Sequence, residues 1–215
     1  NFSSSVGGST YTWSQNAGAG IGLPASGNGN IPAFVGVNIG NTPIVATFTV
    51  TPTGPASTNC VGADIHFTIT INPTPVLTNP SDIEICAGIP TGAINFVSSV
   101  SPTTFNWTNS NTTIGLALAS GTGNIASFIG SNSGTSPNIA LFNVTPVANG
   151  CTGLDQNFIV QVDPIPHVDP VTSQSNCNGT QTLPVILTSP VFGTSFSWSN
   201  PDPSIGLATS GTGNI

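Results

Sequence analysis

The chain has 215 residues, with seven acidic residues, two histidines and no Lys or Arg, which gives a formal net charge of −7. Nucleic-acid binding and electrostatic attachment to anionic lipid are excluded, because both depend on cationic side chains. The 25 Gly and 19 Pro, together with many β-branched residues and few strong helix formers, predict short strands joined by turns. The 37% hydrophobic content, with Phe and Trp at regular intervals, favours a packed core over disorder.

One pattern occurs three times along the chain. Each copy has an aromatic-x-Trp triplet, ending at Trp13, Trp107 or Trp198, followed by Ile-Gly-Leu and then by Gly-x-Gly-Asn-Ile. The Trp spacing is 94 residues (from 13 to 107) and then 91 residues (from 107 to 198). The difference falls in a stretch rich in Pro, Gly and Asn, where a loop tolerates insertions. A period of about 91 residues is the size of one β-sandwich domain.

The repeat predicts three domain ranges. Residues 1–72 are predicted to be a partial Ig-like repeat without its first strand, residues 73–164 a complete repeat, and residues 165–215 the first half of another. Both ends fall inside a repeat, so we expect the chain to be a piece of a longer polypeptide. The links at 72–75 (NPTP) and 163–166 (DPIP) favour extended, semi-rigid geometry, and a rod of repeats is therefore expected.

The elements of the complete repeat are predicted in chain order from apolar alternation and turn residues. They are a broken first strand at a sheet edge (76–77 and 82–85), a second strand (93–98), a third (103–108), short Gly-interrupted pieces (115–130) and a final hairpin (139–145 and 156–163). About seven short strands of this kind predict an all-β, Ig-like sandwich. Trp107 is expected to pack between the two sheets, with Trp13 and Trp198 as the core aromatic residues of the neighbouring repeats.

The order of the motifs resembles that of a known family. The motifs are aromatic-x-Trp, Ile-Gly-Leu, Gly-Thr-Gly-Asn-Ile, Val-Thr-Pro, Asn-Gly-Cys, Val-x-Pro-x-Pro and Cys-x-Gly. They resemble the PKD-like repeats of very large Bacteroidetes surface proteins, which include gliding-motility adhesins and other proteins exported by the type IX system. The resemblance covers the whole chain. It implies tandem Ig-like (PKD-like) sandwiches, a cell-surface or extracellular location and a role in adhesion or filament formation, and it identifies no ligand.

Four cysteines, Cys60, Cys86, Cys151 and Cys177, are disulfide candidates in an extracellular protein. The simplest pairing joins Cys86 to Cys151 within one repeat. In an Ig-like sandwich these positions are expected at opposite poles, about 30 Å apart for strands that rise ~3.3 Å per residue, whereas a disulfide needs Cα atoms within about 7 Å. The alternative is a bond between neighbouring repeats, with Cys151 paired to a cysteine upstream of Asn1. Both pairings stay open.

The sequence does not predict catalysis, a metal site or a cofactor. His66 and His167 do not occupy matching repeat positions and no Cys-x-x-Cys occurs, which argues against zinc. Asp82 and Glu84 alternate on one predicted strand, but a calcium site needs six to eight oxygen ligands. The Gly-Thr-Gly-Asn turns lack the Lys and the helix of a phosphate loop. We therefore expect that the chain is not an enzyme.

Three functions compete. The first is a structural stalk segment of a large extracellular repeat adhesin, whose partners are the neighbouring repeats of the same chain. The second is a subunit of a laterally packed extracellular filament or sheath, in which low charge lets like chains pack closely. A weaker third is a glycan- or ice-binding module that uses a Thr row such as Thr47, Thr49 and Thr51, although the next repeat does not keep that row. No apolar run reaches the length of a membrane span, so membrane insertion is not expected.

Overall fold

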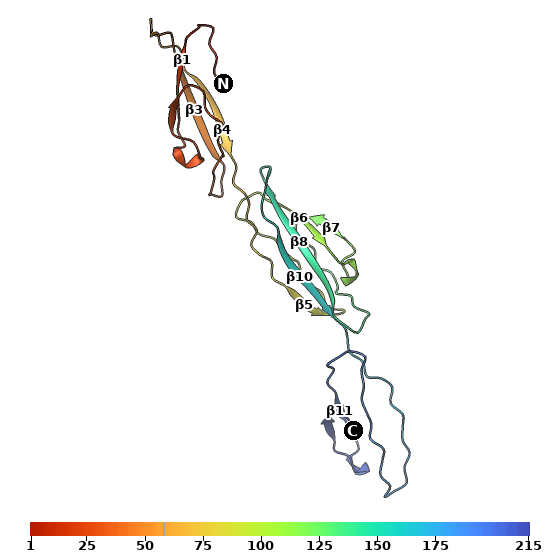
Figure 1. Cartoon of the computed structure of the whole chain (residues 1–215). Helices are drawn as coiled ribbons and strands as arrows, with labels where there is room; N and C mark the ends of the chain where they lie inside the picture. The colour runs from red at the N-terminus through yellow and green to blue at the C-terminus, as the bar shows by residue number, and fades with distance from the viewer. Residues whose placement is uncertain (58) are drawn as a thin grey trace. The chain divides into compact units, whose positions relative to one another are not determined.

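The computed structural model describes residues 1–57 and 59–215. It contains β-strands in three sheets, joined by turns and three short 3-10 helices (Figure 1). The chain divides into two compact units, the first made of Asn1–Asn79, Phe96–Trp107 and Val144–Gln156, and the second of Pro80–Asn95, Thr108–Asn143 and Asn157–Ile215. This division does not follow the predicted domain ranges, which remain a prediction. The first unit contains the link between the first and second repeats.

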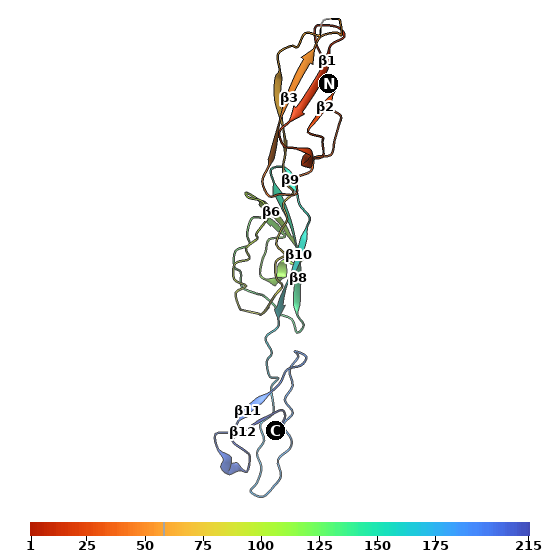
Figure 2. The same cartoon turned by 90° about the vertical axis from the view of Figure 1, so that its left-hand side faces the viewer.

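The first sheet is antiparallel and has the strand order β2-β1-β3-β4 (Figure 2). Its strands are β1 (Thr10–Gln15), β2 (Ser26–Asn28), β3 (Ile44–Thr53) and β4 (Ile65–Ile71). The two long strands, β3 and β4, form because β-branched and aromatic residues alternate with polar ones along them.

The core of the first sheet follows from that alternation. Ala46, Phe48 and Val50 are buried on one face of β3, while the residues between them point outward. The ring of Phe48 stacks on that of Phe67 with centroids 5.0 Å apart, and it lies 6.2 Å from the ring of Trp13. Phe67 belongs to β4, so aromatic contacts join three neighbouring strands into one core.

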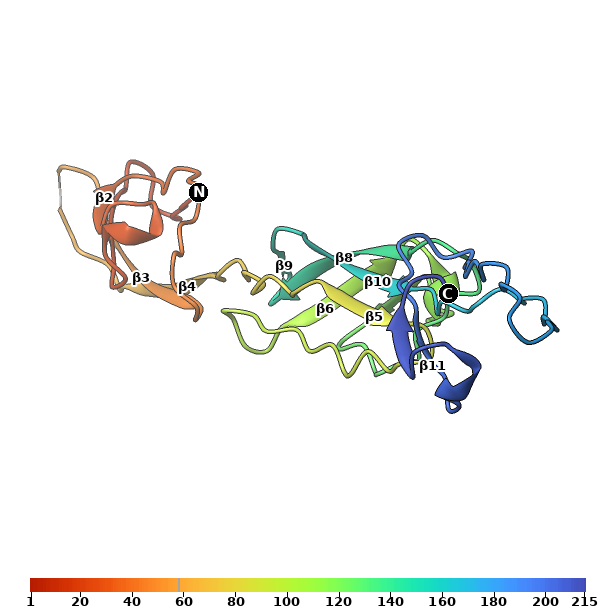
Figure 3. The same cartoon turned by 90° about the horizontal axis from the view of Figure 1, so that it is seen from below.

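The second sheet has the order β5-β10-β8-β6-β7, with β9 added to β8 (Figure 3). Its strands are β5 (Ile83–Cys86), β6 (Thr104–Asn109), β7 (Ser120–Thr122), β8 (Asn138–Ala148), β9 (Cys151–Thr152) and β10 (Gln156–Asp163). The predicted third strand and final hairpin are confirmed as β6, β8 and β10. The second part of the predicted edge strand, 82–85, is confirmed as β5, which pairs in parallel with β10, whereas the first part, 76–77, makes only a single bridge from Leu77 to Ser98.

The predicted second strand of this repeat, 93–98, does not form a continuous ladder. The segment makes single bridges, Ile94 to Ile125 and Ser98 to Leu77. Ile94 and Phe96 are nevertheless buried and the residues between them are exposed, so the predicted in-out alternation holds. Gly92 precedes the segment with φ of +73°, in the left-handed region that favours glycine.

The Ile-Gly-Leu motif forms the end of a 3-10 helix in every repeat: η1 (Ala19–Ile21), η2 (Thr112–Ile114) and η3 (Pro203–Ile205). Ile21 and Ile114 are fully buried. The glycine that follows is left-handed, and a Cβ on Gly115 would lie 2.0 Å from the carbonyl oxygen of Ile129. In the first and second repeats the motif therefore buries an isoleucine and lets two backbone segments meet at a position that only glycine permits, whereas Ile205 of the third repeat is exposed.

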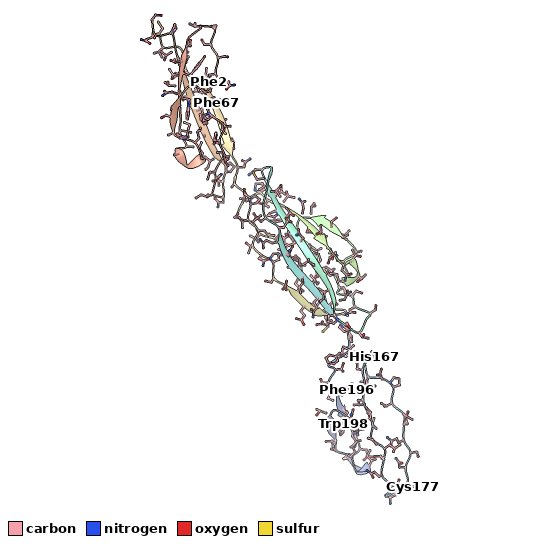
Figure 4. All side chains as sticks on the ribbon, viewed as in Figure 1. Phe2, Phe67, His167, Cys177, Phe196 and Trp198 are labelled. Atoms are coloured by element: carbon pink, nitrogen blue, oxygen red, sulfur yellow. The ribbon has the colours of Figure 1, made fainter. Side chains whose placement is uncertain are left out.

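The third sheet contains β11 (Ser197–Ser199) and β12 (Ser210–Thr212), paired antiparallel. Trp198 on β11 is half-buried, and a Cβ on Gly211 would lie 2.2 Å from its ring. Figure 4 shows Phe196 and Trp198 close together on this part of the chain. In the first repeat, Gly27 lies against the ring of Trp13 in the same way, which explains the first glycine of the Gly-x-Gly-Asn-Ile motif.

The stacked pair of Phe142 and Phe158, with centroids 4.9 Å apart, is fully buried on β8 and β10. Phe142→Ala is expected to destabilise the middle repeat by about 3–5 kcal/mol, because it removes a buried ring and leaves a cavity. Hydrogen exchange of the β10 amides should accelerate more than a hundredfold. The control is Leu141→Ala on the same strand, whose side chain is 48% exposed. Equal acceleration in both variants would contradict this account of the core.

Asp202 precedes η3, and its carboxylate accepts hydrogen bonds from the side chain and the backbone N–H of Ser204, which lower the pKa of Asp202. The cap should therefore be stable at neutral pH and be lost as the pH falls through this lowered pKa. Asn111 caps η2 in the same way without a charge. Asp202→Asn is thus expected to keep the cap and abolish its pH dependence. An NMR titration of the Ser204 amide tests this, and an unchanged titration in the variant would contradict it.

Candidate functional site at the repeat junction

The link between the first and second repeats is covered by protein. β4 ends at Ile71, and the Asn72-Pro73-Thr74-Pro75 segment follows. Proline donates no backbone hydrogen bond, so the ladder stops here. Both Pro73 and Pro75 are fully buried. A free linker would leave them exposed to water, and their burial means that the link is part of a packed structure.

The turn between β8 and β9 contacts this link. Asn149 and Gly150 both have positive φ, +50° and +78°, which is the geometry of a tight hairpin turn. The carbonyl oxygen of Asn149 accepts a hydrogen bond of 2.9 Å from the side-chain amide of Asn72. The Sγ of Cys151 lies 4.0 Å from the backbone carbonyl oxygen of the same Asn72. One residue at the end of the first repeat therefore contacts two positions of the hairpin of the second.

Gly153 brings the hairpin into backbone contact with the link. Its N–H donates to the carbonyl oxygen of Pro146 across the hairpin, at 2.9 Å. A Cβ at Gly153 would lie 2.0 Å from the carbonyl oxygen of Pro75 and 2.9 Å from the Cγ of Pro146. There is no room for a side chain. Glycine after Cys-x is thus required by the packing of one repeat on the link from the other.

A shallow hollow of about 480 Å³ lies beside the link. Its lining residues come from the 38–41 loop, from the link and from the following repeat: Asn38, Ile39, Gly40, Asn41, Thr74, Val76 and Ser99. Asn38 holds this loop in place by donating to the carbonyl oxygen of Ile71 at 2.8 Å. The lining contains no titratable side chain. The lining therefore offers amide and hydroxyl groups and no side chain that acts as an acid or base near neutral pH.

The titratable residues have structural contacts. The carboxylates of Asp64 and Asp155, which occupy equivalent repeat positions, each accept a hydrogen bond of 2.6 Å from a threonine on the neighbouring strand. Asp82 accepts from the backbone N–H of Ile159 at 2.8 Å, which ties the start of β5 to β10. His66 is 3.0 Å from the hydroxyl of Thr49. These contacts join strands within a repeat.

No metal centre is formed by the residues described, 1–57 and 59–215, since no group of three or more His, Cys, Asp or Glu could hold an ion there. The carboxylate of Asp82 already accepts a backbone hydrogen bond. His167 lies 3.8 Å from Asp169 in an exposed pair.

Within the same described residues, no helix is long and apolar enough to cross a membrane.

The core tryptophans and the cysteines lie in different environments. Trp13 and Trp107 are buried, and Trp198 is half-buried. Cys60, Cys86 and Cys177 are exposed, and Cys177 lies at the tip of a loop (Figure 4). Cys151 is partly buried at the junction. All four cysteines are among the described residues, and no disulfide joins any two of them.

Sequence reasoning identified the cysteines but missed the junction residues Asn72, Asn149 and Gly153. The available signal was the repeated Cys-x-Gly after a hairpin turn and the repeated Pro-x-Pro link. The sequence period shows that the Cys-x-Gly and Pro-x-Pro motifs both recur. It does not show that the Pro-x-Pro link contacts the hairpin of the next repeat, because the contacting residues are 77 and 79 positions apart in the chain.

Comparison with known proteins supports the domain type. Residues 84–166 match the family model of the PKD-like domain. The match overlaps nearly all of the predicted complete repeat and supports a PKD-like domain with an Ig-like fold there. Such a domain is typical of a structural or adhesion-type extracellular module. No curated protein matches the chain.

Two solved structures are similar to the chain at low identity. One is the human desmocollin-1 ectodomain, with 12% identity, a TM-score of 0.32, and coverage of 90% of this chain and 42% of that chain. The other is zebrafish RET cadherin-like domains 1 to 4, with 13% identity, a TM-score of 0.25, and coverage of 89% and 52%. The chain thus spans less than two thirds of the length of either.

Replacing Gly153 should loosen the junction. Gly153→Ala is expected to push the hairpin from Pro75 at a cost of about 1–3 kcal/mol, so hydrogen exchange over residues 72–78 should rise about ten- to a hundredfold. The control is Gly62→Ala at the equivalent position of the first repeat. A Cβ there would lie 3.0 Å from the Cγ of Pro52, much as one at Gly153 would lie near Pro146, but 3.6 Å from the backbone carbonyl oxygen of Pro52. If exchange over 72–78 is unchanged in Gly153→Ala, the hairpin does not stabilise the link.

Proposed function

We propose that this chain is a stalk segment of a large extracellular repeat adhesin, in which PKD-like repeats hold a binding region away from the cell surface. The proposal extends to the Bacteroidetes context of the resemblance: a surface protein exported by the type IX system and used in adhesion or gliding motility. The partners of each repeat are its neighbours in the same chain. The role is mechanical, and it requires no active site.

The covered link between repeats is the observation on which the proposal rests. A stalk holds its binding region away from the cell surface only if its domains resist bending where they join. Pro73 and Pro75 are buried, Asn72 is hydrogen-bonded to the hairpin of the next repeat, and Gly153 packs on the link carbonyl. Each contact reduces the number of conformations open to the link. A Gly/Ser linker of equal length would behave as a flexible coil.

The composition of the surface agrees with this role. Charged residues make up 3% of the chain, and Lys and Arg are lacking. The exposed surface therefore has no cleavage site for proteases that require a basic residue, which suits a protein that stays outside the cell. Hydrogen bonds between Thr and Asp, and between Asn and backbone, replace the ion pairs of an ordinary surface.

A laterally packed filament is the second candidate, and one observation favours it. Val45 and Ile139 occupy equivalent positions of the first and second repeats, and both are about half exposed, at 52% and 47%. Leu141, two residues further along β8, is 48% exposed on the same face. An apolar residue at a recurring exposed position suits contact between like chains, provided that the chains are separate subunits.

The mass of the natural polypeptide separates the two candidates. An antibody raised against this chain is used to probe cells under reducing and denaturing conditions. A band of hundreds of kilodaltons is expected for a stalk segment, and a band near the 21.5 kDa of this chain would contradict it and support a small filament subunit. Proteinase K treatment of intact cells should remove the signal, and a signal protected until lysis would contradict the surface location.

A further inference from the structure

We propose that neighbouring repeats are joined by a disulfide between Cys151 and the cysteine that occupies, in the preceding repeat, the position held by Cys86 in the second. The bond would cross the junction described above. It is independent of the stalk proposal, because it applies equally to repeats within a stalk and to repeats within a filament.

The first step is the position of Cys86 within its own repeat. In the parallel pairing of β5 with β10, Cys86 lies in register with Asp163, the last residue of β10. The next residue, Ala87, donates its N–H to the carbonyl oxygen of Asp163 at 2.9 Å. Cys86 is therefore held beside the residue at which the final strand of the repeat ends.

The second step is the counterpart of Asp163 in the first repeat. The segments FTITINPTP (67–75) and FIVQVDPIP (158–166) align without a gap, so Asn72 corresponds to Asp163. Asp163 is the last residue of β10, Asn72 directly follows β4, and both precede Pro-x-Pro. A cysteine equivalent to Cys86 in the first repeat would thus lie in register with Asn72.

The third step is the contact of Cys151 with that same residue. The Sγ of Cys151 is 4.0 Å from the carbonyl oxygen of Asn72. A strand paired with β4 at Asn72 would lie about 4.8 Å away, the usual spacing of neighbouring strands. Its cysteine and Cys151 would then both flank Asn72. In the second repeat Ala87, the residue after Cys86, donates to the carbonyl oxygen of Asp163, and the equivalent oxygen of Asn72 is the atom that the Cys151 Sγ contacts. The two cysteines would thus approach the same carbonyl oxygen, and a disulfide between them requires Cα atoms about 4.4–6.8 Å apart.

The pairing within one repeat does not fit the strand geometry. Cys86 is in register with Asp163 at one end of β10, and Cys151 precedes Gln156 at the other end. Eight residues of β10 span about 23 Å at ~3.3 Å per residue. The disulfide limit of about 7 Å excludes a bond across this length.

The same rule assigns the other cysteines. Cys60 corresponds to Cys151 and Cys177 corresponds to Cys86. Each would pair with a cysteine of a neighbouring repeat, and the rule joins none of these four cysteines to another of the four.

The chemistry of the bond is thiol–disulfide exchange: two protein thiols lose two protons and two electrons, and a small-molecule disulfide such as oxidised glutathione is reduced to two thiols. Cys151 is partly buried, and Cys86, which is equivalent to the proposed partner of Cys151, is exposed, so exchange can begin at the partner cysteine.

An extended chain tests the proposal. Asn1 corresponds to Asn95, so a copy of residues 80–94 placed before Asn1 restores the missing strand of the first repeat with its cysteine. The full chain with this extension is equilibrated in oxidised and reduced glutathione. We expect one disulfide, between the added cysteine and Cys151, so that alkylation labels three thiols after oxidation and five after reduction. Chymotryptic peptide mapping identifies the bonded pair.

Matched variants decide between the possible partners. Cys151→Ser should abolish the bond, and Cys60→Ser should leave it intact. A bond from the added cysteine to Cys60 would overturn the proposal in favour of pairing within a repeat. A second extended chain carries a copy of residues 171–185, which include the cysteine of the third repeat. It tests the same bond if the strand copied from residues 80–94 does not pair with β4. Failure of both extended chains to form a bond to Cys151 would also overturn the proposal.

Discussion

The absence of Lys and Arg is the constraint on which the polar structure of this protein depends. Without cations, the carbonyl groups at strand ends must be satisfied by amides and hydroxyls. Asn38 and Asn132 show the solution at equivalent positions: each side-chain amide donates to the carbonyl of the last apolar residue of the final strand, at 2.8 Å and 2.7 Å. These bonds are directional and uncharged, so they hold the loops onto the sheets with little dependence on salt.

The junction between the first and second repeats is likewise held by uncharged groups. Two repeats meet through a proline-rich link, an Asn side chain and a glycine whose missing side chain admits a backbone carbonyl. The contact surface is small, but it orders the link and places Cys151 beside Asn72. A small contact of this kind is weak by itself, and a covalent bond at the same point would make it permanent. The proposed mechanical role and the proposed disulfide therefore concern one physical problem, the resistance of a domain junction to opening.

Much of each sheet could be predicted from the chain alone. The recurrence of Phe158, Val160 and Val162 at every second position identified β10, and the Gly-rich turns separated the short strands. The segment 93–98 has the same alternation but makes only single bridges. Alternation reports which side chains are buried, and it carries no information on whether a neighbouring backbone runs alongside for long enough to form a ladder.

The sequence by itself determined the all-β class, the period of the repeat, the buried face of each long strand and the lack of cationic chemistry, because these follow from composition and local spacing. Only the tertiary structure decided that β5 pairs in parallel with β10, that Cys86 thereby lies beside Asp163, and that Gly153 rests on Pro75. Register and contact between distant segments depend on how strands meet in space. Local propensity favours a strand at each place, but it does not select the partner of that strand.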